Sequence, residues 1–135
     1  MIYFLDTNIC IYFLTDQYHS IREKLRTIPQ KQIKLPAVVA AELFYGASKS
    51  RKREHNLEQY SQFMGLYEVI PFDHSASRRY GDIRSSLELI GQTIGGNDLM
   101  IAASALSCGA VLVTNNTKEF SRMDNLVIED WTLSS

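Results

Sequence analysis

The sequence lacks any long hydrophobic run. Its 135 residues are 45% hydrophobic and 21% charged, and no stretch approaches the roughly 18 consecutive apolar residues that a transmembrane helix needs. The first residues also lack the basic segment of a secretory signal, because the apolar stretch begins at Ile2 and is interrupted at Asp6. We therefore expect a cytoplasmic protein without a membrane segment, folded as a single domain over residues 1–135.

Cysteine and histidine are scarce as well. Cys10 and Cys108 lie far apart, each in an apolar helical pattern, which predicts two buried free thiols in a reducing compartment. The three histidines, His19, His55 and His74, have no metal-ligand spacing and no partner motif, so we expect surface or satisfied core residues. The chain also has no Gly-x-Ser-x-Gly motif and no phosphate-binding loop, which disfavours serine-hydrolase and P-loop chemistry.

The chain also lacks an excess of positive charge. Fourteen basic residues against 15 acidic residues give a net charge of -1, which argues against a protein that coats nucleic acid through bulk charge. Positive charge is instead concentrated in two clusters, which could hold an RNA backbone locally or could be solvated helix faces. The first cluster is Lys49, Arg51, Lys52 and Arg53, and the second is Arg78, Arg79 and Arg84.

What the sequence does contain is an alternation of short apolar strands and helices. We predict strands at residues 2–5, 31–35, 67–72, 110–113 and 126–128. We predict helices at 9–14, with Thr7 or Asn8 as the cap, at 20–28, and at 37–48 with Pro36 as first residue. Polar residues from 49 onward lead into another helix that runs to about 66. Further helices are predicted from Asp73 to about 89 and from Asn97 or Asp98 to 108, with a short helical turn at 117–122. This alternation predicts an α/β fold, with a mainly parallel sheet of about four to five strands and helices on both faces.

Three carboxylates stand out by position. Asp6 follows the first strand, at the sheet edge where open α/β folds bind ligands. Glu42 lies in a helix with apolar residues on nearly every side, and Asp98 opens an apolar helix after two glycines. Each has an ordinary explanation, as a turn residue, a solvent-facing helix position or a helix cap. If they converge, a cation must offset their repulsion, and an all-oxygen ligand set favours Mg²⁺ or Mn²⁺ over zinc.

Polar residues also follow the strand at 110–113. Thr114, Asn116 and Glu119 are delivered to the same edge of the predicted sheet. Asn116 could hold a water at a metal and Glu119 could be a fourth carboxylate, or either could be a cap or a solvent-facing residue.

Four segments together resemble PIN-domain ribonucleases of the VapC toxin type. They are Met-Ile-Tyr-Phe-Leu-Asp-Thr-Asn at 1–8, Ala-Glu-Leu-Phe-Tyr-Gly at 41–46, Ile-Gly-Gly-Asn-Asp-Leu-Met-Ile-Ala-Ala at 94–103 and Val-Thr-Asn-Asn-Thr-Lys-Glu-Phe at 113–120. The last segment is similar to the enteric-type VapC branch. The resemblance implies a PIN-like three-layer fold and a Mg²⁺- or Mn²⁺-dependent endoribonuclease that forms a homodimer and is neutralised by a VapB-type antitoxin.

The resemblance also implies roles for single residues. Asp6 and Asp98 would be the core metal ligands and Glu42 a third acid. Many PIN domains carry an Asp where this chain has Asn116, so the fourth acidic role passes to Glu119. Thr7, Thr114 and Asn116 would orient water or phosphate, and the two basic clusters would hold the RNA backbone.

The substrate implied is tRNA, with the anticodon stem-loop of initiator tRNA as the specific expectation. Ile9, Tyr12, Phe13 and Phe44 could form a groove for the antitoxin or could belong to the core. One rival interpretation is a catalytically silent PIN-like module that binds RNA or protein, which Asn116 favours. Another is a phosphoryl-transfer domain with Asp6 as nucleophile, disfavoured because position 8 carries no acid.

Overall fold

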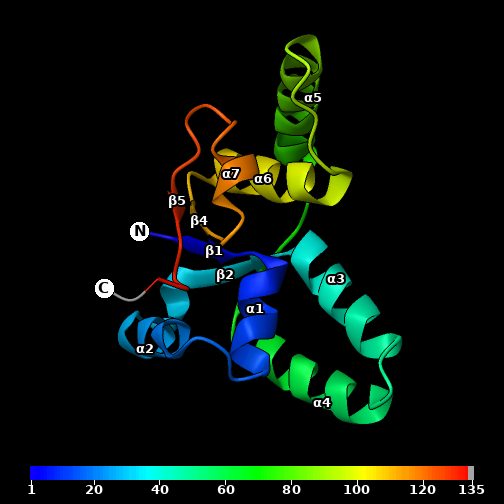
Figure 1. Ribbon diagram of the computed structural model, residues 1–135, viewed down its shortest axis with the longest axis vertical. Helices are drawn as coiled ribbons and strands as arrows, with labels where there is room; N and C mark the ends of the chain where they lie inside the picture. Colours follow the sequence, from blue (N-terminus) through cyan, green and yellow to red (C-terminus); the bar gives the residue numbers. More distant parts are fainter. Residues whose placement is uncertain (134–135) are drawn as a thin grey trace.

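The computed structural model describes residues 1–133, which fold around one parallel sheet (Figure 1). The five strands lie in the order β3-β2-β1-β4-β5, and every neighbouring pair is parallel. The predicted α/β class with helices on both faces is confirmed. The strands are β1 Tyr3–Leu5, β2 Ile33–Pro36, β3 Glu68–Ile70, β4 Val111–Val113 and β5 Ile128–Glu129.

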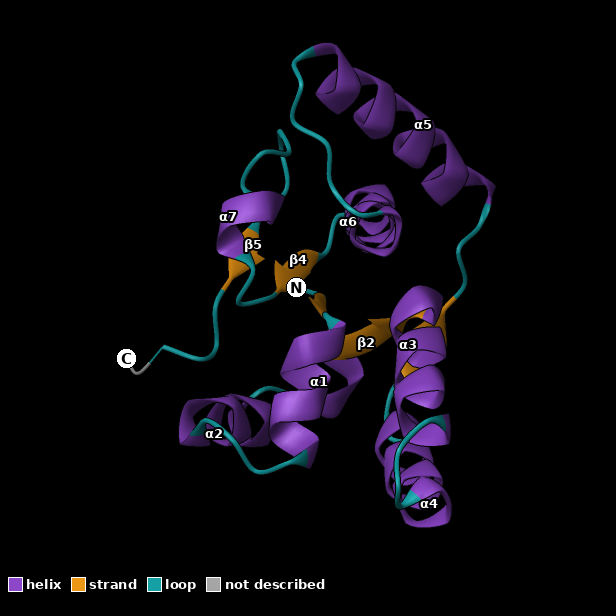
Figure 2. Ribbon diagram, turned by 45° about the vertical axis from the view of Figure 1, so that its right-hand side comes forward, coloured by secondary structure: helices purple, strands orange, loops and turns teal. Residues whose placement is uncertain are grey.

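Seven α-helices cover the two faces of the sheet within residues 1–133 (Figure 2). In both ribbon views α1 to α4 lie on one side of the sheet, and α5, α6 and α7 lie on the other. The change of side coincides with the reversal of strand order after β3, as expected when each parallel crossover is right-handed. The helices are α1 Thr7–Leu14, α2 His19–Thr27, α3 Ala37–Ser48, α4 Arg53–Met64, α5 His74–Leu89, α6 Gly96–Cys108 and α7 Thr117–Phe120.

The hydrophobic core is centred on β1 and β4. Phe4, Leu5 and Leu112 are almost fully buried because helices cover both faces of these strands, the usual situation of a central parallel strand. Trp131 extends the core past β5. Its ring lies 5.5 Å from that of Tyr3, and its backbone carbonyl accepts a 2.7 Å hydrogen bond from the hydroxyl of Ser20 on α2.

Several predicted boundaries were wrong by a few residues, for local reasons. Pro36 ends β2 instead of opening the next helix, and α4 ends at Met64 instead of at about residue 66. Residues 49–52 form a turn that closes α3, in which both the backbone N–H and the hydroxyl of Ser50 donate to the carbonyl of Ala47.

The two thiols differ in exposure. Both are free, as predicted, but only Cys10 is buried. The prediction was wrong for Cys108, which is exposed because it lies in the last turn of α6, just before Gly109 ends the helix with a left-handed φ of 63°. Within residues 1–133, no helix has the length and apolar character needed to cross a membrane.

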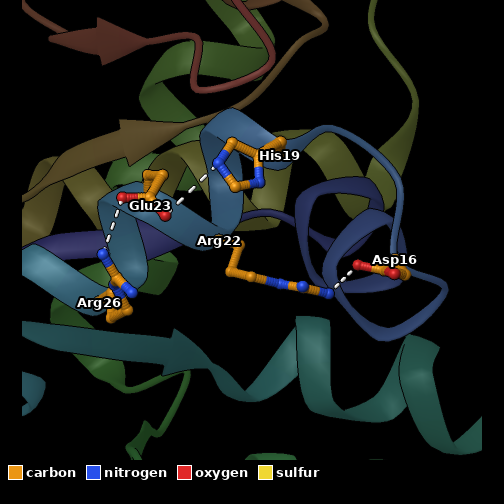
Figure 3. A network of polar contacts seen from close by, with 5 residues as sticks. All are labelled: Asp16, His19, Arg22, Glu23 and Arg26. Carbon is orange, nitrogen blue, oxygen red and sulfur yellow. Dashed lines mark hydrogen bonds and ion pairs between the residues drawn. The ribbon is translucent and has the colours of Figure 1, made fainter.

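Surface ion pairs organise the turn between α1 and α2 (Figure 3). Arg22 pairs with Asp16, and Glu23 receives both Arg26 at 3.2 Å and His19 at 3.5 Å. These side chains are largely exposed, so the pairs add little stability. His19 is a surface residue, as the absence of metal-ligand spacing predicted, and His55 and His74 are exposed too.

Candidate active site

Two polar residues lie side by side at the ends of β1 and β4, the pair of strands at which the strand order reverses. β1 and β4 pair in register up to Leu5 and Val113, so the next residue on each strand, Asp6 and Thr114, reaches the same edge. The N–H of Asp6 donates to the carbonyl of Val113 at 3.0 Å, which extends the ladder by one step. In open parallel sheets this edge, at the switch in strand order, is where ligands bind.

Hydrogen bonds hold the Asp6 carboxylate in one orientation. The side chain is 5% exposed, and its Oδ1 accepts a 3.0 Å bond from the N–H of Ile9. Its Oδ2 accepts a bond from the hydroxyl of Thr114, which in turn accepts the N–H of Asn116 at 3.0 Å. Asp6 is therefore the cap of α1, and the prediction of Thr7 or Asn8 was wrong.

The environment of Asp6 favours its protonated form. Burial raises the pKa of Asp6 from 3.8 to about 6, although the bonds from Thr114 and Ile9 act in the opposite direction. The negative charges of Asp98 and Glu42 raise this pKa further. The carboxylates are therefore close enough to repel one another.

Asp98 lies in the first turn of α6 and is half-buried. Burial is the main cause that raises the pKa of Asp98, and the negative charges of Glu119 and Glu42 raise it further. These charge effects link four acids, which we call the acidic cluster: Asp6 after β1, Glu42 on α3, Asp98 on α6 and Glu119 on α7. Within residues 1–133 none of the four forms an ion pair with a lysine or arginine.

Glu42 is held from two sides. Its Oε1 accepts the hydroxyl of Thr7, and its Oε2 accepts the side-chain N–H of Asn97 at 3.2 Å. The apolar residues around Glu42 do not bury it fully, because Phe44 and Tyr45 are exposed and Glu42 lies half-buried at the border of the buried stripe. Sequence reasoning gave Asn97 no role at the site. The available signal was an amide directly before Asp98, at the start of α6.

Glu119 is oriented by the amide that precedes it. The side-chain N–H of Asn116 donates to Oε2 of Glu119 at 3.0 Å, and both side chains are half-buried. Since the charge of Glu119 raises the pKa of Asp98, Glu119 belongs to the acidic cluster. Asn116 is engaged with Glu119 and Thr114.

The two basic clusters lie in different places. Lys49 lines a groove that also contains Thr7, Glu42 and Asn97; Arg51 and Lys52 follow it in the turn, and Arg53 is the first residue of α4. Arg78, Arg79 and Arg84 are on α5, and both ribbon views place α5 on the other side of the sheet from α3 and α4. Arg84 donates to Tyr80 at 2.7 Å and to Glu88 at 3.2 Å.

The apolar residues considered for a partner groove are divided between core and surface. Ile9 is fully buried, so its proposed role in a surface groove was wrong. Phe13 packs on Phe63 with ring centroids 5.4 Å apart, and the hydroxyl of Tyr12 accepts a 3.1 Å bond from Asn115. Of these four residues Phe44 is the most exposed, at 45%.

Comparison with known proteins identifies the family. The PIN-domain model matches residues 3–126, and ribonuclease VapC2 of Rickettsia felis is 43% identical over 132 residues, which are 97% of this chain and 98% of its own length. This chain belongs to the PIN-domain family, among its VapC ribonucleases. The tRNA(fMet)-specific endonuclease VapC of Shigella flexneri is 39% identical over 96% of this chain and 98% of its own length.

A solved VapC-containing complex has the same fold. The structure of VapBC2 from Rickettsia felis, bound to a DNA fragment from its promoter, matches with a TM-score of 0.91 and 42% identity. The match covers 97% of this chain and 99% of the other chain. The PIN-like fold implied by the four sequence segments is thereby confirmed.

The acidic cluster fits the divalent-metal dependence that is general among VapC ribonucleases of the PIN family. Within residues 1–133, no three Asp, Glu, His or Cys side chains are arranged to hold a metal ion by themselves. Mg²⁺ does not require three, because it keeps several waters and binds through one or two carboxylates. The all-oxygen set and the mutual repulsion of Asp6 and Asp98 therefore fit a hydrated cation.

Proposed function

We propose that this chain is the toxin of a type II toxin–antitoxin pair, a Mg²⁺- or Mn²⁺-dependent endoribonuclease acting in the cytoplasm as one domain over residues 1–135. The acidic cluster carries the proposal. It lies where the strand order of the PIN fold reverses, and within residues 1–133 none of its four acids pairs with a lysine or arginine. A site of this kind attracts a cation and, through it, a phosphodiester.

The substrate proposed is tRNA, cleaved in the anticodon stem-loop of the initiator tRNA. The Shigella flexneri relative bears the name tRNA(fMet)-specific endonuclease, and it matches nearly the whole chain at 39% identity. An anticodon loop also suits an open edge of a sheet, because its unstacked bases and backbone are accessible to protein side chains.

The residues would divide the work as follows. Asp6 and Asp98 would hold the metal, with Glu42 and Glu119 completing the acidic site; when bound, a divalent ion stabilises developing charge on the phosphate and lowers the pKa of water. Thr114 fixes Asp6, and Thr7 together with Asn97 fixes Glu42. Asn116 fixes Glu119. These hydrogen bonds keep the carboxylates oriented before substrate arrives.

The basic residues would hold the RNA backbone, with unequal importance. Lys49 and the turn at 51–53 adjoin the acidic groove, so they contribute most. Arg78, Arg79 and Arg84 on α5 would contact only the outer parts of a large substrate, since they lie across the sheet from α3.

The protein partners proposed are a VapB-type antitoxin and a second copy of the chain. The Rickettsia felis structure that matches this chain is a VapBC complex, which supports the antitoxin. The exposed apolar side chains at the end of α5, Leu89 at 87% and Ile90 at 64%, support a homodimer that covers them.

The proposed activity is tested by induced expression of the chain with and without its antitoxin, followed by sequencing of cleaved RNA ends. Asp6→Ala and Asp98→Asn are expected to abolish growth arrest and cleavage at the anticodon loop, and a chelator is expected to stop cleavage in vitro. Asp124→Asn, an exposed acid outside the cluster, is the control and should cleave normally. Wild-type protein that binds RNA without cleaving it would instead favour a silent module.

A further inference from the structure

A groove runs along α3 from Glu42, which is the member of the acidic cluster that lines it. Its volume is about 570 Å³, within the range of ligand-binding pockets. Glu42 lies at one end, and Lys49 lies seven residues further along the helix, about 10 Å away at 1.5 Å per residue. The apolar side chains of Ile11, Val38, Ala41 and Met100 line the groove between these ends.

Tyr45 is the unexplained residue of this groove. It is 66% exposed, so core packing does not account for an aromatic side chain there. The ammonium group of Lys49 lies 4.7 Å from the centroid of the Tyr45 ring, a cation–π contact that restrains the ring. Within residues 1–133 no other aromatic ring packs on Tyr45.

The charge of the groove changes sign along its length. Glu42 makes one end of the groove negative, and Lys49 makes the other end positive, with Arg51, Lys52 and Arg53 following Lys49 in the chain. In the described part of the chain, none of these four basic residues is engaged in an ion pair. An exposed aromatic ring beside free positive charge is the arrangement by which proteins bind single-stranded nucleic acid.

On the basis of the ribonuclease function proposed above, we propose that Tyr45 stacks on the nucleobase flanking the scissile phosphate and that Lys49 binds the adjoining phosphate. The scissile phosphate then lies at the Glu42 end of the groove, and the apolar wall contacts the face of the sugar and base. Tyr45 and Lys49 are substrate-positioning residues in this arrangement. Stacking is tolerant of base identity, so the platform sets the position of the loop strand and not its sequence.

The test is cleavage kinetics on an RNA stem-loop with a seven-nucleotide loop, after the cleaved bond has been mapped by sequencing. Tyr45→Ala should raise KM and lower kcat/KM by about five- to one-hundred-fold, the range for loss of one aromatic–base stack. Tyr45→Phe and Tyr45→Trp should remain within about twofold of wild type because their rings also stack. Lys49→Gln should weaken binding and make it less sensitive to salt; Lys31→Gln, on an exposed lysine away from the groove, is the charge-matched control.

A substrate lacking the flanking base separates stacking from a structural effect. The kcat/KM of wild type should fall on this abasic RNA by the same factor by which Tyr45→Ala lowers kcat/KM on intact RNA. The kcat/KM of Tyr45→Ala should be the same on abasic and on intact RNA. If the losses in kcat/KM from the variant and from the missing base add up, or if Tyr45→Ala cleaves normally, the stacking proposal is overturned while the proposed function stands. Normal cleavage by Tyr45→Ala combined with weaker antitoxin binding would assign the groove to a protein segment instead. Failure of the wild type to cleave any RNA would overturn the proposed function itself, and this inference with it.

Discussion

The side chain of Asp6 caps α1 and accepts the hydroxyl of Thr114, while the charges of Asp98 and Glu42 act on it. The hydrogen bonds stabilise the carboxylate, but burial outweighs them, and its pKa rises to about 6. A buried acid with a raised pKa destabilises the ionised fold. At the residue scale, therefore, the proposed metal site lowers the stability of the metal-free protein.

Asp6→Asn should stabilise the metal-free protein at neutral pH. Below pH 3.8 both the folded and the unfolded wild type are protonated at this residue, so no penalty exists; the penalty grows between 3.8 and 6 and is complete above 6. The shift of about two pKa units corresponds to about 3 kcal/mol, and Asn removes it. Urea unfolding with chelator at pH 4 and pH 8 measures the difference. Asp73→Asn, at the cap of α5, is the control; an equal gain at both pH values for Asp6→Asn would contradict the assignment.

Asn97→Ala should reduce RNA cleavage without unfolding the protein. The exposed amide donates to Oε2 of Glu42, so its loss leaves that carboxylate held by Thr7 alone. Residues that orient metal-site ligands typically contribute about 10- to 100-fold to metal affinity or activity, and we expect a loss in the lower part of this range. Gln62→Ala, which removes an exposed amide on α4, should cleave as wild type does. Equal activity of both variants would show that Glu42 needs no support from Asn97.

At the scale of elements, the ends of helices position the site. α1 begins at Thr7 directly after β1, and α6 begins at Gly96, two residues before Asp98. The other end of α6 leads within two residues into β4, through Gly109 in the left-handed region. This tight turn connects the helix that carries Asp98 to the strand that delivers Thr114.

Gly109→Ala and Gly81→Ala should change stability in opposite directions. At Gly109 an added Cβ meets no atom within 4 Å, but the φ of 63° strains any L-residue, at a cost of about 1 kcal/mol. Gly81 lies inside α5, also in open space and with ordinary helical backbone, so alanine should stabilise the helix by about 1 kcal/mol. Chemical denaturation of the two variants measures both effects; the same sign for both would refute this account of the turn.

At the scale of the whole molecule, the parallel sheet brings residues separated by up to 113 positions into one site. β1 and β4 are neighbours although most of the chain lies between them, and the strand order reverses at this pair. Asp6, which follows β1, is influenced there by the charges of Glu42 on α3 and Asp98 on α6, and Asp98 is influenced by Glu119 on α7. The proposed metal binding would therefore depend on the complete fold, and it should stabilise that fold in return.

Mn²⁺ should raise the thermal unfolding temperature of the wild type in a saturable manner. The cation offsets the repulsion among Asp6, Asp98 and Glu42, and the gain grows with concentration according to linkage. The rise should be larger at pH 8 than at pH 5, because Asp6 with a pKa of about 6 must lose its proton to bind metal. Asp98→Asn should lose most of the shift and Asp124→Asn should keep it. A shift unaffected by Asp98→Asn would place the binding elsewhere.

Local periodicity determined much of this protein from the sequence alone. The apolar run before Asp6, the alternation of strands and helices, and the glycine that ends α6 were sufficient for the α/β class and for the expectation that Asp6 and Thr114 reach one edge of the sheet. These features depend on residues only a few positions apart, so the local pattern of apolar and polar residues is sufficient to predict them.

The tertiary structure decided which side chains meet. The bonds from Asn97 to Glu42 and from Asn116 to Glu119, the exposure of Cys108 and the separation of the two basic clusters depend on how α3, α5, α6 and α7 pack on the sheet. Crossover handedness and helix packing are set by contacts between residues far apart in the chain, and residue spacing carries no direct record of them. The site was therefore predictable as a set of acids, and its geometry only from the fold.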